Sequence, residues 1–228
     1  MNVEFIEVEN STDLIIIFSS HNQPNFLGYK SLTNAMKNYP KISLLFLSDP
    51  ENMYYLGFDG GKINKEIIRK YVNKFPPENI TFFGSSMAGY AAIFFGSIFN
   101  GNIFASNPQI NFGVTSALSW NTLRNNIARI PIKIDLDLHL NAFLNDSVIY
   151  IVHGLHRLDI ANMGLLMTTP LRKSRIFIER IDDESHGFYL PSLIKLFEIH
   201  YVLILLRHKK ITGINLIAQQ NINKIISE

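Results

Sequence analysis

The chain has 228 residues, of which 47% are hydrophobic and 18% charged, a balance that excludes a disordered chain and fits one α/β domain with its own core. A formal net charge of +2, with basic residues scattered except at 207–210, gives no support for nucleic-acid binding. The absence of cysteine excludes disulfides, thiolate zinc sites and a cysteine nucleophile.

The N-terminal residues predict a short edge strand over 3–8, because apolar and acidic side chains alternate there. They lack the basic start and long apolar core of a signal peptide, and no run of 18 uncharged apolar residues follows. The expected location is therefore cytoplasmic.

Continuous β-branched and aromatic runs, interrupted by segments of helical periodicity, follow along the chain. The predicted strands are 14–18, 41–48, 80–84, 102–106, 148–152 and 175–179, and the predicted helices are 63–74, 115–127, 158–171 and 191–206. Because strands and helices alternate, we expect an α/β fold of three layers, a mostly parallel sheet with helices on both faces.

Two segments stand apart from this alternation. Residues 130–145 have a weak pattern and are interpreted as a cap or an insertion within a domain spanning 1–206. Residues 211–226 place isoleucines at helical spacing, so 207–228 is expected to be a helical C-terminal extension.

Residues 80–95 read as a strand, a sharp turn and a helix, with Ser86 at the turn. Such a turn exposes the serine hydroxyl above the sheet, where the first free N–H groups of the helix also point. Strand and helix approach closely there and need small residues, which Gly84, Ala88 and Gly89 supply. The alternative is a glycine-rich turn that binds nothing, or one that binds a phosphate at the helix N-terminus.

The motif Gly-Ser-Ser-Met-Ala at 84–88 resembles the nucleophile elbow Gly-x-Ser-x-Gly of the α/β-hydrolase family, with alanine at the second glycine and a glycine one place later. The resemblance extends over about residues 3–206. It implies an α/β-hydrolase-like sheet and the order nucleophile, acid, histidine, each after a strand. Ser86, Asp159 and His186 follow three predicted strands in this order.

The loops around the acid and the histidine extend the resemblance. Ser-His-Gly-Phe around His186 looks like the family's catalytic-histidine loop, and residues 154–159 look like its acid loop with a slightly long spacing. Chemically, a serine hydroxyl needs a base, and the base needs an acid to fix its tautomer. His186 could instead be an exposed loop histidine. Asp159 could instead be a helix N-terminal acid, and Asp182 or Asp183 would then be the alternative catalytic acid.

The resemblance also implies an oxyanion hole with two N–H donors. One is the backbone N–H of Met87, and the other comes from the polar loop after strand 14–18, where Ser20 is the candidate. In the same loop His21 and Gln23 are expected to bind substrate. The loop 107–120 could also line the cleft, although Trp120 could equally pack in the core or a cap.

No metal and no bound cofactor are expected. His153 and His156 lie near Asp159 in the sequence, but no cluster of carboxylates accompanies them, and loop histidines are usually structural or solvent-exposed.

The longer motif Gly-Ser-Ser-Met-x-Gly-Tyr-Ala resembles that of small hydrolase-like proteins acting on bacterial surface carbohydrates. This implies an esterase or O-acetyltransferase that works through an acyl-serine on a carbohydrate O-acyl group, with a small-molecule or glycan substrate and acetyl-CoA as a candidate donor. The alternative is an inactive hydrolase-fold scaffold that contacts a partner, a membrane surface or a second copy through residues 191–226.

Overall fold

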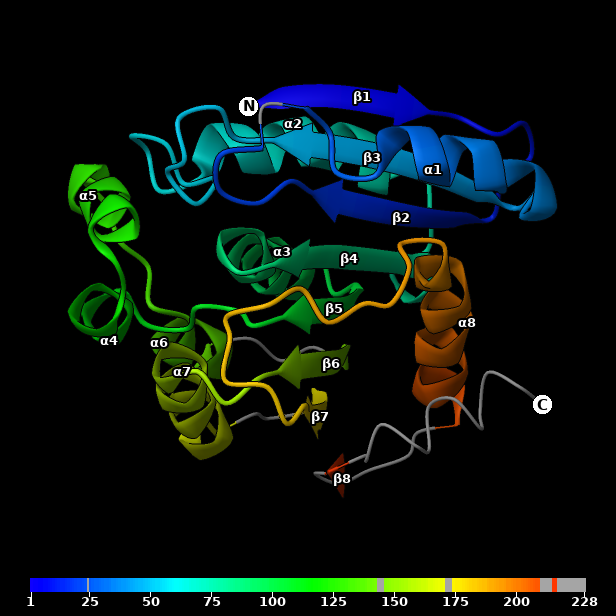
Figure 1. The fold of residues 1–228 in the computed structure, drawn as a ribbon. Helices are drawn as coiled ribbons and strands as arrows, with labels where there is room; N and C mark the ends of the chain where they lie inside the picture. The colour runs from blue at the N-terminus through cyan, green and yellow to red at the C-terminus, as the bar shows by residue number, and fades with distance from the viewer. Residues whose placement is uncertain (24, 143–145, 171–173, 210–214, 217–228) are drawn as a thin grey trace.

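The computed structural model describes residues 1–23, 25–142, 146–170, 174–209 and 215–216. Within them, eight strands form one sheet in the order β1-β3-β2-β4-β5-β6-β7-β8 (Figure 1). The strands are β1 Asn2–Ile6, β2 Asp13–Phe18, β3 Ile42–Ser48, β4 Ile80–Ser85, β5 Asn102–Ser106, β6 Val148–His153, β7 Arg175–Arg180 and β8 Asn215–Leu216. Only β1 runs antiparallel to its neighbour, so the prediction of a mostly parallel sheet is confirmed.

The central strand β2 explains why the sheet needs helices on both faces. All six of its residues are buried, and successive side chains point to opposite faces. Ile16 and Phe18 contribute to the larger apolar core on one face, whereas Ile15 and Ile17 contribute to the second core on the other face. The uninterrupted apolar run in the sequence is the consequence of this two-sided burial.

The helices form the outer layers of the predicted three-layer arrangement (Figure 1). Helices α1 (Tyr29–Ala35) and α8 (Lys195–His208) bury apolar side chains in the core that contains Ile15 and Ile17. The opposite core receives side chains from the remaining α-helices, which are α2 Lys62–Val72, α3 Met87–Ile98, α4 Phe112–Leu118, α5 Asn121–Arg129, α6 Leu136–Asn141 and α7 Arg157–Thr168. Short 3₁₀ turns, η1 Met36–Asn38 and η2 Pro77–Asn79, precede β3 and β4.

The single helix predicted over 115–127 is wrong, because the structure has two helices there. α4 ends at Leu118, and Ser119 and Trp120 have extended backbone before α5 begins. Arg124 of α5 donates hydrogen bonds to the carbonyls of Ser116 and Ser119, and so supplies partners for carbonyls at the end of α4.

The C-terminal segment also differs from its prediction. α8 begins at Lys195 rather than at 191, because the N–H groups of Lys195 and Leu196 bond three residues back in tight turns. Most of the helix predicted over 211–226 lies outside the described residues. Asn215–Leu216, the two that are described, are not helical but pair as a short parallel strand with β7, whose edge they cover.

The segment that includes α6 packs onto the loop after β5. Leu136 and Leu140 are buried in the larger core, and the N–H of Leu136 donates to the carbonyl of Ile110. The carboxylate of Asp135 accepts a hydrogen bond from the N–H of Phe112 at 2.7 Å. No helix in the described part of the chain has both the length and the apolar character needed to cross a membrane.

Candidate active site

Ser86 lies at the sharp turn between β4 and α3, with φ 56° and ψ −120°. A non-glycine residue with positive φ is strained, and surrounding contacts must hold it there. The N–H of Ser86 donates to the carbonyl of Ser106 at the end of β5, and its carbonyl accepts from Tyr90 in the first turn of α3. The strand, its neighbour and the helix together fix the turn that projects the hydroxyl.

Gly84 permits this turn because no side chain fits beside it. A Cβ at residue 84 would lie 2.1 Å from the carbonyl oxygen of Ala88, which is backbone and cannot move aside. We therefore expect Gly84→Ala to lower the free energy of unfolding by about 3 kcal/mol or more, measured by urea denaturation. The matched control is Gly164→Ala in α7, where a Cβ meets nothing within 4 Å and alanine should stabilise the helix by about 0.5–1 kcal/mol. An equal change in the free energy of unfolding in the two variants would contradict the steric account.

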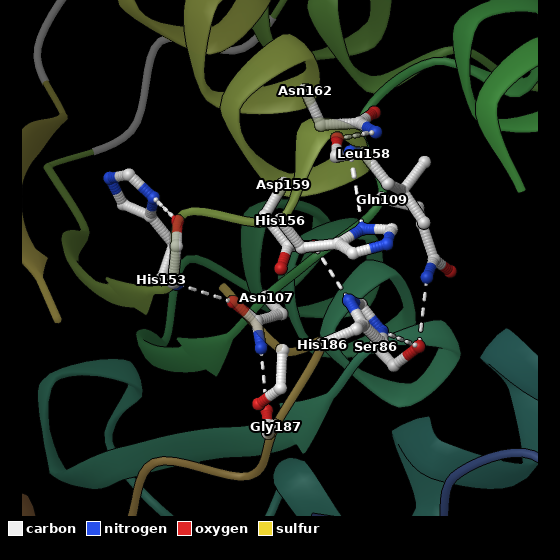
Figure 2. Close-up of polar contacts among 12 residues, drawn as sticks. Ser86, Asn107, Gln109, His153, His156, Leu158, Asp159, Asn162, His186 and Gly187 are labelled. Atoms are coloured by element: carbon white, nitrogen blue, oxygen red, sulfur yellow. Dashed lines mark hydrogen bonds and ion pairs between the residues drawn. The ribbon is translucent and has the colours of Figure 1, made fainter. Parts of the chain in front are cut away.

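The structure brings Ser86, Asp159 and His186 together, although they are far apart in the sequence (Figure 2). His186 Nε2 lies 2.8 Å from Ser86 Oγ, and His186 Nδ1 lies 2.6 Å from Asp159 Oδ1. The carboxylate is almost fully buried, and the imidazole side chain is 13% exposed. The arrangement can pass a proton from the serine hydroxyl to an imidazole whose tautomer is set by a carboxylate.

Asp159 lies in the first turn of α7, where the partial positive charge of the helix N-terminus favours a carboxylate. The helix-terminal interpretation and the contact with His186 are therefore compatible. Of the alternative acids, Asp182 is exposed, and Asp183 accepts hydrogen bonds from the backbone and hydroxyl of Ser185. These bonds lower the pKa of Asp183, and they make its side chain part of the loop that carries His186.

Asn107, which the sequence analysis did not single out, joins the acid loop to the histidine loop. Its side-chain nitrogen donates to the carbonyl of Gly187, and its side-chain oxygen accepts from the N–H of Gly154 at 3.0 Å (Figure 2). Asn107 has a φ of 45°, a left-handed conformation that asparagine adopts more readily than most residues. The Asn-Pro pair directly after a buried strand was the available signal.

Gln109 is the second residue that sequence reasoning missed. Its Nε2 donates to Ser86 Oγ at 2.8 Å, and the side chain is 1% exposed. The backbone beside it is held by buried Asn162 of α7, whose Oδ1 accepts from the N–H groups of Ile110 and Asn111. Nothing in the local sequence distinguishes this glutamine from other loop residues, because its role depends on the approach of two loops.

The predicted oxyanion donors lie on either side of the elbow. Met87 is the first residue of α3, so its N–H has no acceptor within the helix. Ser20 contacts the elbow through its hydroxyl, which donates to the carbonyl of Ser85 at 2.9 Å. The N–H of Ser20 donates to the side-chain carbonyl oxygen of Gln23, also at 2.9 Å. The N–H that was predicted to bind a substrate carbonyl is therefore hydrogen-bonded to a side-chain amide oxygen of the chain itself.

Of two other predicted residues, Trp120 contacts His186, whereas His21 makes no described contact with Ser86 or His186. His21 is half-buried, its Nε2 has no hydrogen-bond partner among the described residues, and burial lowers its pKa. Trp120 lies edge-on to His186 with ring centroids 5.5 Å apart, and it remains 42% exposed. This exposure places Trp120 at the protein surface beside the imidazole rather than in the core.

His156, Asp159 and His186 offer three ligand atoms within 4.8 Å of one another. A metal ion on these atoms would compete with the hydrogen bond that joins Asp159 to His186. His153 has a different role, because its Nδ1 is bonded to the carbonyl of Gly154 at 2.8 Å. Burial lowers the pKa of His153, which favours its neutral form.

No protein-family model matches the chain, and no curated protein sequence does. Among solved structures, the capsule O-acetyltransferase of Neisseria meningitidis serogroup A is similar to it, with a TM-score of 0.61 and 16% identity over 89% of this chain and 91% of that one. The fluorophosphonate-binding serine hydrolase F of Staphylococcus aureus has a TM-score of 0.54 and 13% identity over 88% and 85%.

The acylaminoacyl peptidase of Pyrococcus horikoshii is larger than this chain. It has a TM-score of 0.63 and 14% identity over 98% of this chain but only 41% of that one. Identities this low are informative about the fold alone. With the strand order and the elbow described above, they show that the chain has the α/β-hydrolase fold.

Proposed function

We propose that the protein is a serine enzyme that transfers an acyl group through an acyl-Ser86 intermediate. The observation that carries the proposal is the continuous hydrogen-bonded path from Ser86 Oγ through His186 to the buried carboxylate of Asp159. The strained conformation of Ser86 supports it, because backbone strain tends to persist where function requires it.

In the first half-reaction Ser86 Oγ attacks the carbonyl carbon of an ester or thioester while its proton moves to His186 Nε2. The negative charge on the carbonyl oxygen is stabilised by the N–H groups of Met87 and Ser20, each worth about 3 kcal/mol of barrier. For Ser20 to donate, the side chain of Gln23 must first leave its N–H. His186 then gives its proton to the leaving group as the tetrahedral intermediate collapses to acyl-Ser86.

In the second half-reaction an acceptor removes the acyl group. Water as acceptor makes the enzyme an esterase, and a sugar hydroxyl makes it an O-acyltransferase. We favour an O-acetyl group on a carbohydrate, with acetyl-CoA as a candidate donor for transfer. Two observations support this class: a capsule O-acetyltransferase is among the similar structures, and an exposed indole lies beside the imidazole.

The proposal is tested by labelling the purified protein with a fluorophosphonate probe and measuring its intact mass. The wild type is expected to gain one probe adduct at Ser86, and folded Ser86→Ala none. Incubation with acetyl-CoA or a generic acetyl ester is expected to add one acetyl group to the wild type only. Absence of both adducts from folded wild type would refute the acyl-serine mechanism, and donor cleavage that is independent of any sugar acceptor would refute transfer.

Trp120 provides a test of the carbohydrate acceptor. An exposed aromatic face beside the base can stack against a sugar ring, so Trp120→Ala is expected to raise KM for a sugar acceptor about tenfold and to change acetylation of Ser86 little. Trp120→Phe should retain most of the binding. The control is Leu138→Ala, which removes a 73% exposed side chain of α6. An unchanged KM in Trp120→Ala would argue against an acceptor site at this face.

A further inference from the structure

The hydrogen bonds around Ser86 fix which atoms of Gln109 face the nucleophile. His186 Nδ1 carries a proton because it bonds to the carboxylate of Asp159, so neutral His186 has an acceptor lone pair on Nε2. Ser86 Oγ donates its proton to that lone pair. Only lone pairs of Oγ remain for Gln109, so the glutamine must present its N–H, and Oε1 must point away.

The orientation of Gln109 has an energetic cost, because its Oε1 is buried and has no hydrogen-bond partner among the described residues. A buried polar atom without a partner destabilises a fold by about 1–3 kcal/mol, and an apolar side chain of similar size would avoid this cost. Asn162 accepts hydrogen bonds from the backbone N–H groups of Ile110 and Asn111, which fixes the backbone of the loop that carries Gln109. An amide kept at this position despite its cost indicates a use in the reaction.

The contact between Gln109 and Ser86 must change when the serine is acylated. An ester oxygen is a much weaker hydrogen-bond acceptor than a hydroxyl oxygen, so acylation removes the resting partner of Gln109 Nε2. The incoming acceptor must lie near His186 Nε2, which takes its proton, and near the carbon bonded to Oγ. His186 Nε2 and Gln109 Nε2 each lie 2.8 Å from Ser86 Oγ, so both nitrogens are within reach of an acceptor oxygen beside the acyl carbon.

We propose that Gln109 is a further catalytic residue, whose amide N–H binds the oxygen of the acyl acceptor once Ser86 is acylated. The acceptor O–H loses its proton to His186 Nε2, and its oxygen, held by Gln109, bonds to the acyl carbon. The bond between that carbon and Oγ then breaks, and Oγ takes the proton back from His186. This inference rests on the acyl-serine mechanism proposed above, and it assigns Gln109 to the second half-reaction.

The test follows formation and loss of acetyl-Ser86 separately by intact mass, with p-nitrophenyl acetate as donor. Its leaving group departs without protonation, so acylation does not depend on a donor at the acceptor position. Gln109→Met removes the N–H groups at similar length. It is expected to acylate within about threefold of the wild type and to lose the acetyl group about tenfold more slowly after the donor is removed.

Two further variants keep the result interpretable. Gln109→Asn retains an amide, and serves if Gln109→Met does not fold; its shorter side chain should also slow deacylation. The matched control is Asn126→Leu. Asn126 is another buried amide, its Nδ2 has no hydrogen-bond partner among the described residues, and it lies in α5 rather than in the loop that carries Gln109. Asn126→Leu should leave both steps unchanged.

The outcomes separate this inference from the proposed function. Lack of any acetyl-Ser86 in the wild type refutes the acyl-serine mechanism itself. If the wild type is acetylated, the role of Gln109 is refuted when Gln109→Met slows both steps by the same factor, slows acylation alone, or slows neither. Selective slowing of deacylation supports it.

Discussion

His186→Ala is expected to lower kcat for cleavage of a chromogenic acetyl ester by about a millionfold, and Ser86→Ala to lower it by a similar factor. Without the imidazole, the hydroxyl keeps its proton during attack and the leaving group receives none. Without the hydroxyl, the base has nothing to activate. Either substitution removes the proton transfer altogether, because Ser86 Oγ and His186 Nε2 share one hydrogen bond at 2.8 Å.

The double variant distinguishes a catalytic unit from two independent contributions. Ser86→Ala combined with His186→Ala should be no slower than either single variant, because the second substitution removes a group that has already lost its partner. The control is His156→Asn. The ring centroid of His156 lies 6.0 Å from that of His186, and an asparagine at residue 156 can still cap α7. Activity of His186→Ala within a hundredfold of the wild type would contradict the proposed base.

The elbow was predictable from the sequence because its determinants are local. Strand-forming residues run directly into small ones, and only glycine fits beside Ala88 at residue 84. The order of Ser86, Asp159 and His186 could be read in the same way, since each follows a buried strand of a parallel sheet. Ends of parallel strands meet at one edge, so residues far apart in the sequence were expected to converge.

Asn107 and Gln109 could not be predicted in that way. Asn107 bridges Gly154 and Gly187, and Gln109 reaches Ser86, through contacts that depend on how three loops pack. Their sequence neighbourhood carries no periodicity from which such contacts follow. The break in the helix predicted over 115–127 has a similar origin, because Arg124 bonds to carbonyls of the preceding helix only in the folded chain.

Asp159→Asn is expected to lower kcat about ten-thousandfold while leaving the geometry of the site intact. The carboxylate can only accept a hydrogen bond, so it fixes the proton on His186 Nδ1 and leaves Nε2 free to accept from Ser86. An asparagine amide can instead donate to Nδ1. The proton of the imidazole then moves to Nε2, and His186 can no longer take the proton of Ser86.

The size of this effect depends on burial, which separates Asp159 from the acids of the histidine loop. Asp159 is 1% exposed, so water cannot replace its carboxylate as the partner of Nδ1. Asp183→Asn is the matched control, because Asp183 bonds to Ser185 at the surface. This substitution should lower kcat by no more than about tenfold, through loosening of the loop. Steady-state kinetics with one acetyl ester measures both variants. A larger loss of kcat in Asp183→Asn than in Asp159→Asn would indicate that the catalytic acid is Asp183 of the histidine loop.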